Sequence, residues 1–327
     1  MLFADKSRLD LQALAPEFHE PATNSARRCE ACQACLRVLT CVCASAVFYT
    51  YANGTLSPYG AEAAGLVRSL AKHGKLLPEK YAEESAEEFK AYPGRLNSIS
   101  KTYLAQCVPA VWVLQLACAD ATRFRRWDAG ARWPSCGVAG DTQAHCLVRV
   151  PALVARYAGK PELRTAVADA VLVHQTHPAP ADYALAYAAL LERVVLGAPL
   201  ADALKWAAFD KGNPLFDEQR KQAQDALADL DVDPRDIVSK YGISCSLPGP
   251  FVGPLAIVFS AGGNFETAVR ANIVAGGDSC SRAAVVGGLC GAAGGMAALP
   301  AAWRAKVTDW KELEDCADKI IAAANFA

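Results

Sequence analysis

The chain has 327 residues, of which 53% are hydrophobic and 20% are charged, and its formal net charge is −1. This composition provides enough apolar side chains for a large core and excludes an intrinsically disordered protein. Because there is no overall positive charge, we expect neither nucleic acid nor an anionic membrane surface as a partner.

Residues 1–25 are expected to form an irregular lead-in, because Pro16 and Pro21 discourage a long helix. Residues 26–327 are predicted to form a single helical domain, since no segment shows the period-two alternation of a half-buried strand. The expected helices span about residues 25–51, 58–74, 77–92, 98–127, 142–159, 161–177, 181–197, 201–210, 217–230, 265–275, 279–295 and 309–324. The predicted fold class is therefore all-α, a compact orthogonal array of helices.

The N-terminal stretch is charged from Asp5 onward and lacks an apolar segment followed by a cleavage site, so no secretory signal is expected. We therefore place the protein in the cytoplasm or another reducing intracellular compartment, where its 13 cysteines are expected to be reduced. The run 283–303 carries no charge and is long enough for a membrane span. It is mostly Ala and Gly and contains Pro300, which favours a buried helix and no membrane partner.

The segment GGDSCSRAAVVGGLCGAAGG, residues 276–295, combines a tight turn, a helix start and a helix of small side chains. Asp278 and Ser279 stand at the expected N-cap. Four small residues recur at four-residue intervals: Ala283, Gly287, Gly291 and Gly295. Such a stripe lets neighbouring helices approach the backbone closely. We expect this rigid helix to carry a functional site at its N-terminus.

Three segments of the chain resemble motifs of the ADP-ribosylglycohydrolase family. Residues 271–303 are similar to its C-terminal signature, GGD-[ST]-D-[ST] followed by an Ala/Gly-rich helix, a Pro and an aromatic residue. Residues 51–75 stand where the family has its first acidic motif, roughly Y-[ST]-D-D-T. Residues 174–197 look like its HP-containing helix pair, and the likeness extends from about residue 36 to about residue 322. The resemblance implies the family's helical fold and cleavage of ADP-ribosyl glycosidic bonds.

Within the family, the resemblance points to the branch of J-crystallins and selenoprotein J. Its hallmarks are an SPYG-type segment in place of the acidic pair and GGD-S-x-S-R in place of GGD-T-D-T. Residues 57–60 and 278–282 match both hallmarks. J-crystallins are abundant eye-lens proteins, so the resemblance implies a structural use of an old enzyme fold.

The resemblance also implies the loss of a magnesium site. Active family members hold one or two Mg²⁺ ions with carboxylates and hydroxyls from both motifs. In the first motif Ser57 takes the place of a hydroxyl ligand, and the two aspartates after it become Pro58 and Tyr59. This motif therefore keeps no carboxylate.

The second motif keeps one carboxylate, Asp278, whereas Cys280 replaces an aspartate and Ser281 replaces a Thr or Ser. Mg²⁺ is a hard cation that needs oxygen ligands, and a thiolate is a soft substitute. No cofactor is therefore expected. Magnesium would bind only if Asp278, Ser57 and Ser281 still sufficed.

Arg282 lies four residues after Asp278, so we expect its guanidinium to fold back toward that carboxylate and to replace the charge of the metal. The alternative is that Arg282 points to solvent. The expected residues of the remaining cleft are Ser57, Tyr59, Asp278, Ser279, Cys280, Ser281 and Arg282.

Two further carboxylates join Asp278 as residual catalytic candidates. Asp141 lies in a segment where family members bring substrate-contacting residues near the cleft, and Glu62 follows the SPYG segment. The ordinary alternative for both is a surface carboxylate. For His174 and His177, near the end of an expected helix, capping or a core hydrogen bond is favoured over catalysis.

The cysteines allow two other hypotheses. Cys280 near a helix N-terminus is a candidate reactive thiol, although a small buried cysteine is the commoner case. Five cysteines cluster near the N-terminus: Cys29, Cys32, Cys35, Cys41 and Cys43. In the family this region is a first helix rich in small residues, so we favour packing there, with zinc or an iron–sulfur cluster as the alternative.

The favoured function is a catalytically degenerate protein with a structural or interaction role, in an assembly with other proteins or by self-association. The alternative is an active hydrolase of ADP-ribosyl or related glycosidic bonds, which would bind an ADP-ribose-like ligand. A thiol-dependent activity at Cys280 is the third interpretation.

Overall fold

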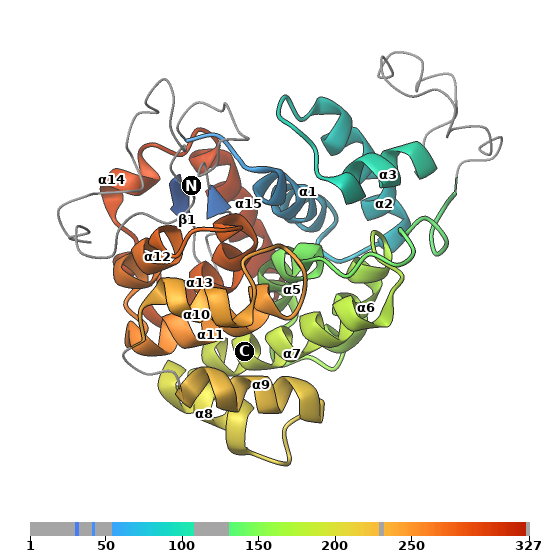
Figure 1. The fold of residues 1–327 in the computed structure, drawn as a ribbon. Coiled ribbons are helices and arrows are strands. Elements are labelled where there is room, and N and C mark those ends of the chain that lie inside the picture. Colours follow the sequence, from blue (N-terminus) through green and yellow to red (C-terminus); the bar gives the residue numbers. More distant parts are fainter. Residues whose placement is uncertain (1–29, 33–40, 43–53, 108–130, 229–231, 325–327) are drawn as a thin grey trace.

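The computed structural model describes most of the chain, and its regular structure is almost entirely helical (Figure 1). The described residues are 30–32, 41–42, 54–107, 131–228 and 232–324. The all-α prediction is confirmed for them. The predicted lead-in, residues 1–25, lies outside the described residues.

The helices follow one another with mostly short connections. Their bounds are α1 (Pro58–His73), α2 (Pro78–Ala91), α3 (Ser98–Cys107), the 3₁₀ helix η4 (Ala144–Arg149), α5 (Val150–Tyr157), α6 (Leu163–Leu172), α7 (Pro178–Val195), α8 (Leu200–Phe209), α9 (Asp217–Ala228), α10 (Pro234–Tyr241), α11 (Gly249–Ser260), α12 (Phe265–Val274), α13 (Ser279–Gly294), the 3₁₀ helix η5 (Met296–Ala298), α14 (Ala301–Arg304) and α15 (Trp310–Ala324).

A short antiparallel pair of strands, β1 (Glu30–Cys32) and β2 (Cys41–Val42), stands within the helix predicted over residues 25–51. The helical prediction is therefore wrong for these two strands. The sequence LTCVC around β2 contains the β-branched residues Thr and Val, which favour an extended backbone. The other three cysteines of the N-terminal cluster lie outside the described residues.

Helix starts and stops follow the predicted proline and glycine signals. α1 begins at Pro58 after the cap Ser57 and ends before Gly74, whose φ of 68° is left-handed. α7 begins after His177, whose Nδ1 accepts a hydrogen bond from the Ala179 N–H at 3.2 Å. The capping role expected of His177 is confirmed.

Sequence patterns did not predict α10 and α11. α10 has only eight residues and begins after the cap Asp233. α11 is apolar on nearly every side and contains Pro254, and both features hide a helical period. α11 is buried because it packs against α13, α9 and α10.

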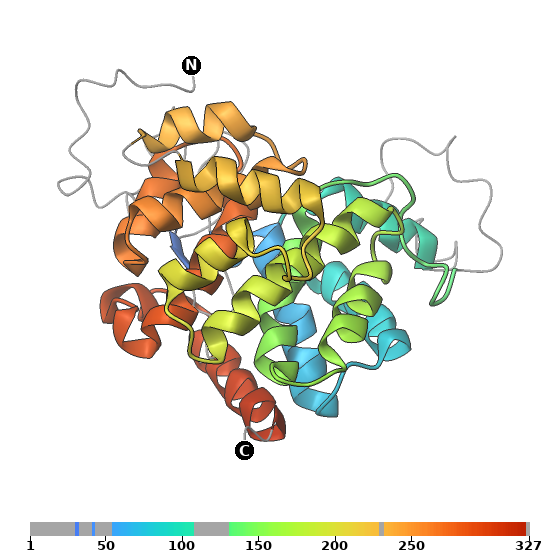
Figure 2. The same ribbon diagram turned by 90° about the horizontal axis from the view of Figure 1, so that it is seen from below.

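α13 is packed on several sides by other helices. It contacts α11, α12, α7 and η4, and the grouping of these helices is seen in Figures 1 and 2. α1 packs against α2, α15 and also η4. The two helices whose N-terminal turns were predicted to form a site therefore both pack against η4.

A close approach to the backbone of α13 occurs at Gly288. A Cβ atom on this residue would lie 2.0 Å from the hydroxyl oxygen of Tyr187, which donates to the Ala284 carbonyl at 2.8 Å. Gly295, a member of the predicted stripe, instead follows α13 as its C-cap with a φ of 60°. The small residue needed for this contact thus lies one position beyond the stripe residue Gly287.

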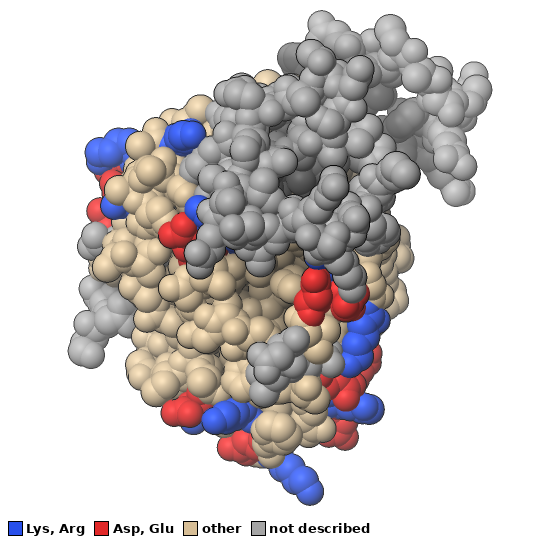
Figure 3. Space-filling view, turned by 60° about the vertical axis from the view of Figure 1, so that its left-hand side comes forward, with Lys and Arg blue, Asp and Glu red and all other residues tan. Residues whose placement is uncertain are grey.

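None of the described helices combines the length and the apolar run that crossing a bilayer requires. On the face in Figure 3, the visible acidic and basic side chains are interspersed and lie mainly toward the margins. This distribution agrees with a formal net charge of −1.

Replacing Gly288 by Ala should overpack the contact with Tyr187. We expect Gly288→Ala to lower the free energy of unfolding by about 1–3 kcal/mol, because Tyr187 is fully buried and its ring has little room to move. Chemical denaturation measures this difference.

The variant Tyr187→Phe provides the control for this contact. It removes the clashing oxygen, so the double variant Gly288→Ala/Tyr187→Phe should be less destabilised than the sum of the two single variants. Strict additivity would contradict the proposed contact.

Candidate functional site

The two turns predicted to form the site lie in direct contact. The hydroxyl of Tyr59, in the first turn of α1, donates a hydrogen bond to Oδ2 of Asp278, which precedes α13, at 3.3 Å. The two residues are 219 positions apart in the sequence. The fold thus joins the two motif segments through side chains that both belong to the predicted site.

The first turn of α1 holds Ser57 and Tyr59 in buried positions. The Ser57 hydroxyl oxygen accepts a hydrogen bond from the Gly60 N–H at 3.1 Å, which satisfies a backbone group at the helix start. Burial, followed by the negative charge of Asp278, raises the pKa of Tyr59 well above its ordinary value. Tyr59 therefore stays protonated and acts as a hydrogen-bond donor.

Two glycines set the position of Asp278. Gly276 and Gly277 have φ angles of 73° and 62°, and a Cβ on Gly277 would lie 2.4 Å from the Ile243 carbonyl oxygen. The same carbonyl accepts a hydrogen bond from the Asp278 N–H at 2.8 Å. The Asp278 carboxylate caps α13 by accepting from the Ser281 N–H at 3.3 Å, as expected of an N-cap.

The three residues that follow Asp278 are buried. The Ser281 hydroxyl donates to the Asp278 carbonyl at 3.0 Å, and the Ser279 carbonyl accepts from Asn272 Nδ2 at 2.9 Å. Cys280 is 7% exposed. Asp278 itself, in contrast to the three residues after it, is partly exposed.

Arg282 does not point to solvent, so that alternative is wrong, whereas its expected approach to the Asp278 carboxylate stays a prediction. It is fully buried, and its Nε donates to Oδ1 of Asn272 at 2.8 Å. Its Nη2 donates to the carbonyls of Asn272 and Gly276. Carbonyls at the C-terminal end of a helix lack partners within the helix and carry partial negative charge, so the end of α12 attracts the guanidinium. Arg282 thereby fixes the turn that presents Asp278.

The donor atoms at this site do not fit magnesium. Mg²⁺ requires near-octahedral oxygen ligation, with carboxylates to offset its dehydration. Asp278 supplies one carboxylate, while the Ser57 and Ser281 hydroxyls bond the backbone and Tyr59 is a neutral phenol. Within the described residues, no group of three or more His, Cys, Asp or Glu side chains is placed to hold a metal ion.

Glu62 lies in a buried charge network and is not a surface residue. Both of its carboxylate oxygens lie 2.9 Å from Nδ1 of His145, and Arg149 Nη2 lies 3.4 Å from Oε2. Asn97 Nδ2 and the Ser100 hydroxyl donate to Oε1 at 3.2 and 3.1 Å. The carboxylate is therefore surrounded by protein donors.

The charge of Glu62 is retained in spite of its burial. Burial alone would raise the pKa of Glu62, but the charge and hydrogen bond of His145, together with Arg149, lower it overall. Arg149 is also fully buried and donates from Nε to the Tyr81 hydroxyl at 3.1 Å. The centroid of the His145 ring lies 4.9 Å from that of the Tyr59 ring, so this network supports Tyr59.

Asp141 belongs to a loop network beside the site. Its carboxylate accepts from the Gln143 N–H at 3.0 Å and from Gln175 Nε2 at 2.8 Å. The Cys245 thiol donates to Gln143 Oε1 at 3.1 Å. Burial raises the pKa of Cys245, and the charges of Asp278 and Asp141 add to this effect. Asp141 thus lies in the electrostatic neighbourhood of Asp278, with both of its oxygens engaged.

His174 packs in the core. Its ring is buried against the rings of Tyr81, Phe89 and Tyr103, with centroid distances of 5.3, 5.6 and 4.5 Å. Burial lowers the pKa of His174 well below its ordinary value, so the ring is neutral at pH 7.

Sequence reasoning missed His145, Arg149, Cys245 and Asn272. The spacing of four residues between His145 and Arg149, in AHCLVR, was a usable signal because it is typical of two side chains on one helix face. Cys245 and Asn272 gave no such signal, since their roles depend on the turn of the chain between α12 and α13 and on a loop 102 residues away.

Replacing Glu62 by Gln removes the charge that offsets two buried basic groups. We expect Glu62→Gln to lower the free energy of unfolding at pH 7 by about 3–5 kcal/mol, because Arg149 is left without its carboxylate. Chemical denaturation measures the effect. Glu79→Gln, an exposed change on α2, is the matched control and should have little effect.

The same pair of proteins should differ in pH dependence. The pKa of Glu62 is lowered on folding, so its contribution to stability is present above the ordinary value of 4.5 and is lost as the pH falls through the folded value. The gap in stability between wild type and Glu62→Gln should therefore shrink below pH 4.5. A gap that stays constant to lower pH contradicts this account.

Two crystallins resemble this chain over most of its length. Crystallin J1A of Tripedalia cystophora is 27% identical over 276 residues, 84% of this chain and 81% of that protein. Crystallin J1B of the same organism is 25% identical over 275 residues, with coverage of 84% and 81%. The expected likeness to J-crystallins is therefore confirmed.

The fold has a counterpart among solved structures. A chain described as "ADP-ribosylglycohydrolase-related protein complex" superposes with a TM-score of 0.61, covers 83% of each chain and is 20% identical, a level that supports the fold alone. The ADP-ribosylglycohydrolase family model matches residues 15–326. This chain therefore belongs to the ADP-ribosylglycohydrolase family.

Proposed function

We propose that this protein is a catalytically inactive member of its family with a structural or interaction role. The observation that carries the proposal is the hydrogen bond from Tyr59 to Asp278. A protonated phenol, which brings no negative charge and is a poor ligand for magnesium, engages the carboxylate that the second motif keeps. The site is thereby closed by its own side chains without a divalent ion.

The missing carboxylates support the same proposal. In active family members, aspartates stand where this chain has Pro58, Tyr59 and Cys280. The magnesium ion positions the ADP-ribosyl group and activates a water molecule for hydrolysis, so its ligands are needed for the reaction. Asp278 is the one carboxylate that the two motifs keep, and a single carboxylate does not supply the negative charge that offsets the dehydration of Mg²⁺.

Neither Glu62 nor Asp141 is placed to act as a general base in the absence of the magnesium centre. A general base must reach the water or substrate proton that it removes. Glu62 is 2% exposed and bonded to His145, Asn97 and Ser100. Asp141 is bonded to Gln143 and Gln175. These contacts favour a structural role for both carboxylates over the hydrolase alternative.

The thiol-dependent alternative also gains little support. A reactive cysteine needs access and a lowered pKa. Cys280 is 7% exposed, and burial raises the pKa of the neighbouring Cys245. The low exposure of Cys280 favours a buried packing residue over a reactive thiol.

The relatives suggest which non-catalytic role this is. Two similar proteins carry the name crystallin, and the helical core and near-neutral charge of this chain suit a dense assembly. We infer that the protein associates with other proteins of such an assembly or with copies of itself. Sedimentation of the purified protein over a range of concentrations tests self-association.

Calorimetric titration should reveal no Mg²⁺ binding at millimolar concentration and no magnesium-dependent binding of ADP-ribose. The physical reason is the single carboxylate at the site. Magnesium-dependent binding or release of ADP-ribose by the wild type would contradict the proposal.

Restoring the carboxylates provides the positive arm of this test. In Pro58→Asp/Tyr59→Asp/Cys280→Asp, the added charges should lower Tm without metal and make Tm rise when Mg²⁺ is added, because bound metal stabilises the folded state. Tyr59→Phe is the matched control, since it removes the hydrogen bond to Asp278 without adding a ligand. Its Tm should not respond to Mg²⁺.

A further inference from the structure

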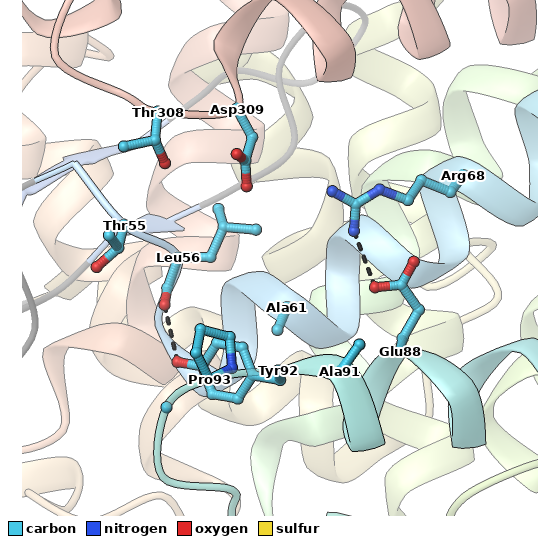
Figure 4. A pocket seen from close by; sticks show the side chains of 11 residues that line it. Thr55, Leu56, Ala61, Arg68, Glu88, Ala91, Tyr92, Pro93, Thr308 and Asp309 are labelled. Carbon is cyan, nitrogen blue, oxygen red and sulfur yellow. Dashed lines mark hydrogen bonds and ion pairs between the residues drawn. The ribbon is translucent and has the colours of Figure 1, made fainter.

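A cavity of about 540 Å³ lies beside the first turns of α1, between that helix, the end of α2 and the segment before α15 (Figure 4). Tyr59, Glu62 and Asp278 do not line it, so it is separate from the site described above. Its volume is in the range of pockets that hold small organic molecules.

One wall of the cavity is apolar and includes an aromatic ring. Its residues are Leu56, Ala61, Ala91, Tyr92 and Pro93. The Tyr92 hydroxyl donates to the Leu56 carbonyl at 2.8 Å, which fixes the position of the ring (Figure 4). This wall offers a surface against which an apolar or aromatic group can pack.

Arg68 is the one basic residue among the described residues that line the cavity. Its Nη1 donates to Glu88 at 2.9 Å, and its Nε and Nη2 donate to the two carboxylate oxygens of Glu312 at 2.7 and 3.0 Å. The guanidinium is therefore held between two carboxylates. It is not directed at a ligand.

Asp309 adds a third carboxylate to this group. In Figure 4 its side chain points into the space between Leu56 and Arg68. Its carboxylate makes no hydrogen bond with a described side chain, but its charge, after the contacts of Glu312 and Glu88, helps to raise the pKa of Arg68. The start of α15 offsets part of its charge. Among the described residues that line the cavity, Glu88 and Asp309 outnumber Arg68, so these residues carry a negative formal charge.

We propose that this cavity binds a small organic cation, an amine with an apolar or aromatic body. The ammonium group would lie near Asp309, and the body would pack on Tyr92 and Pro93, where an aromatic face also attracts positive charge. An anion of the same shape would be repelled by Asp309 and Glu88. A neutral molecule would gain the apolar wall alone.

Three probes of similar shape and different charge test this proposal on the full chain. They are tryptamine, which is a cation at pH 7, tryptophol, which is neutral, and indole-3-acetate, which is an anion. Calorimetric titration at low salt should show tryptamine binding at least about tenfold more tightly than tryptophol, and indole-3-acetate more weakly still. Added salt should weaken the binding of tryptamine.

Two variants locate the binding to the cavity. Asp309→Asn should weaken tryptamine binding about tenfold and leave tryptophol unchanged. Ala91→Leu, a change at an exposed lining residue, should weaken all three probes by filling the cavity. The matched control Asp202→Asn, an exposed change on α8 outside the cavity, should change nothing.

The proposal is overturned if tryptamine does not bind, if all three probes bind equally, or if Asp309→Asn binds tryptamine as the wild type does. Should Asp309→Asn fail to fold, the ranking of the three probes and the effect of Ala91→Leu still decide the outcome. Because neither variant touches Tyr59 or Asp278, these results are independent of whether the family site is catalytically inactive.

Discussion

The hydrogen bond between Tyr59 and Asp278 links the first turns of α1 and α13, and several neighbouring contacts serve to keep these two residues in place. Gly276 and Gly277 turn the chain before Asp278, and Arg282 holds that turn through the Gly276 carbonyl. Burial and the charge of Asp278 keep the phenol of Tyr59 protonated. Two neighbouring helix starts are thus joined by a polar contact that needs no bound cation.

Two carboxylates near this contact have their oxygens bonded by other protein side chains. Glu62 is enclosed by His145 and Arg149, and Asp141 is bonded by Gln143 and Gln175. Charged groups that are fully bonded inside a protein are suited to holding one structure and poorly suited to exchanging protons with a substrate. These contacts agree with the proposed structural role.

Capping residues, prolines and glycines in the sequence predicted those helices whose ends are set by residues close to them in the chain. Pro58, Gly74 and His177 mark helix ends by their own backbone or capping chemistry, so α1 and α7 were found. α11 was not, because it is apolar throughout and its position depends on the helices around it. The strands β1 and β2 were also missed, since each is only two or three residues long.

The residues of the candidate site were likewise predicted only in part. Motif resemblance identified Tyr59 and Asp278, but the direction of Arg282 depends on carbonyls at the end of α12, which no spacing within α13 reveals. The most direct test of the central claim is a high-resolution crystal structure of the protein grown in magnesium. We predict the Tyr59 hydroxyl within hydrogen-bond distance of Asp278, with no metal between them. A six-coordinate ion on Asp278, with Tyr59 displaced, would contradict the account.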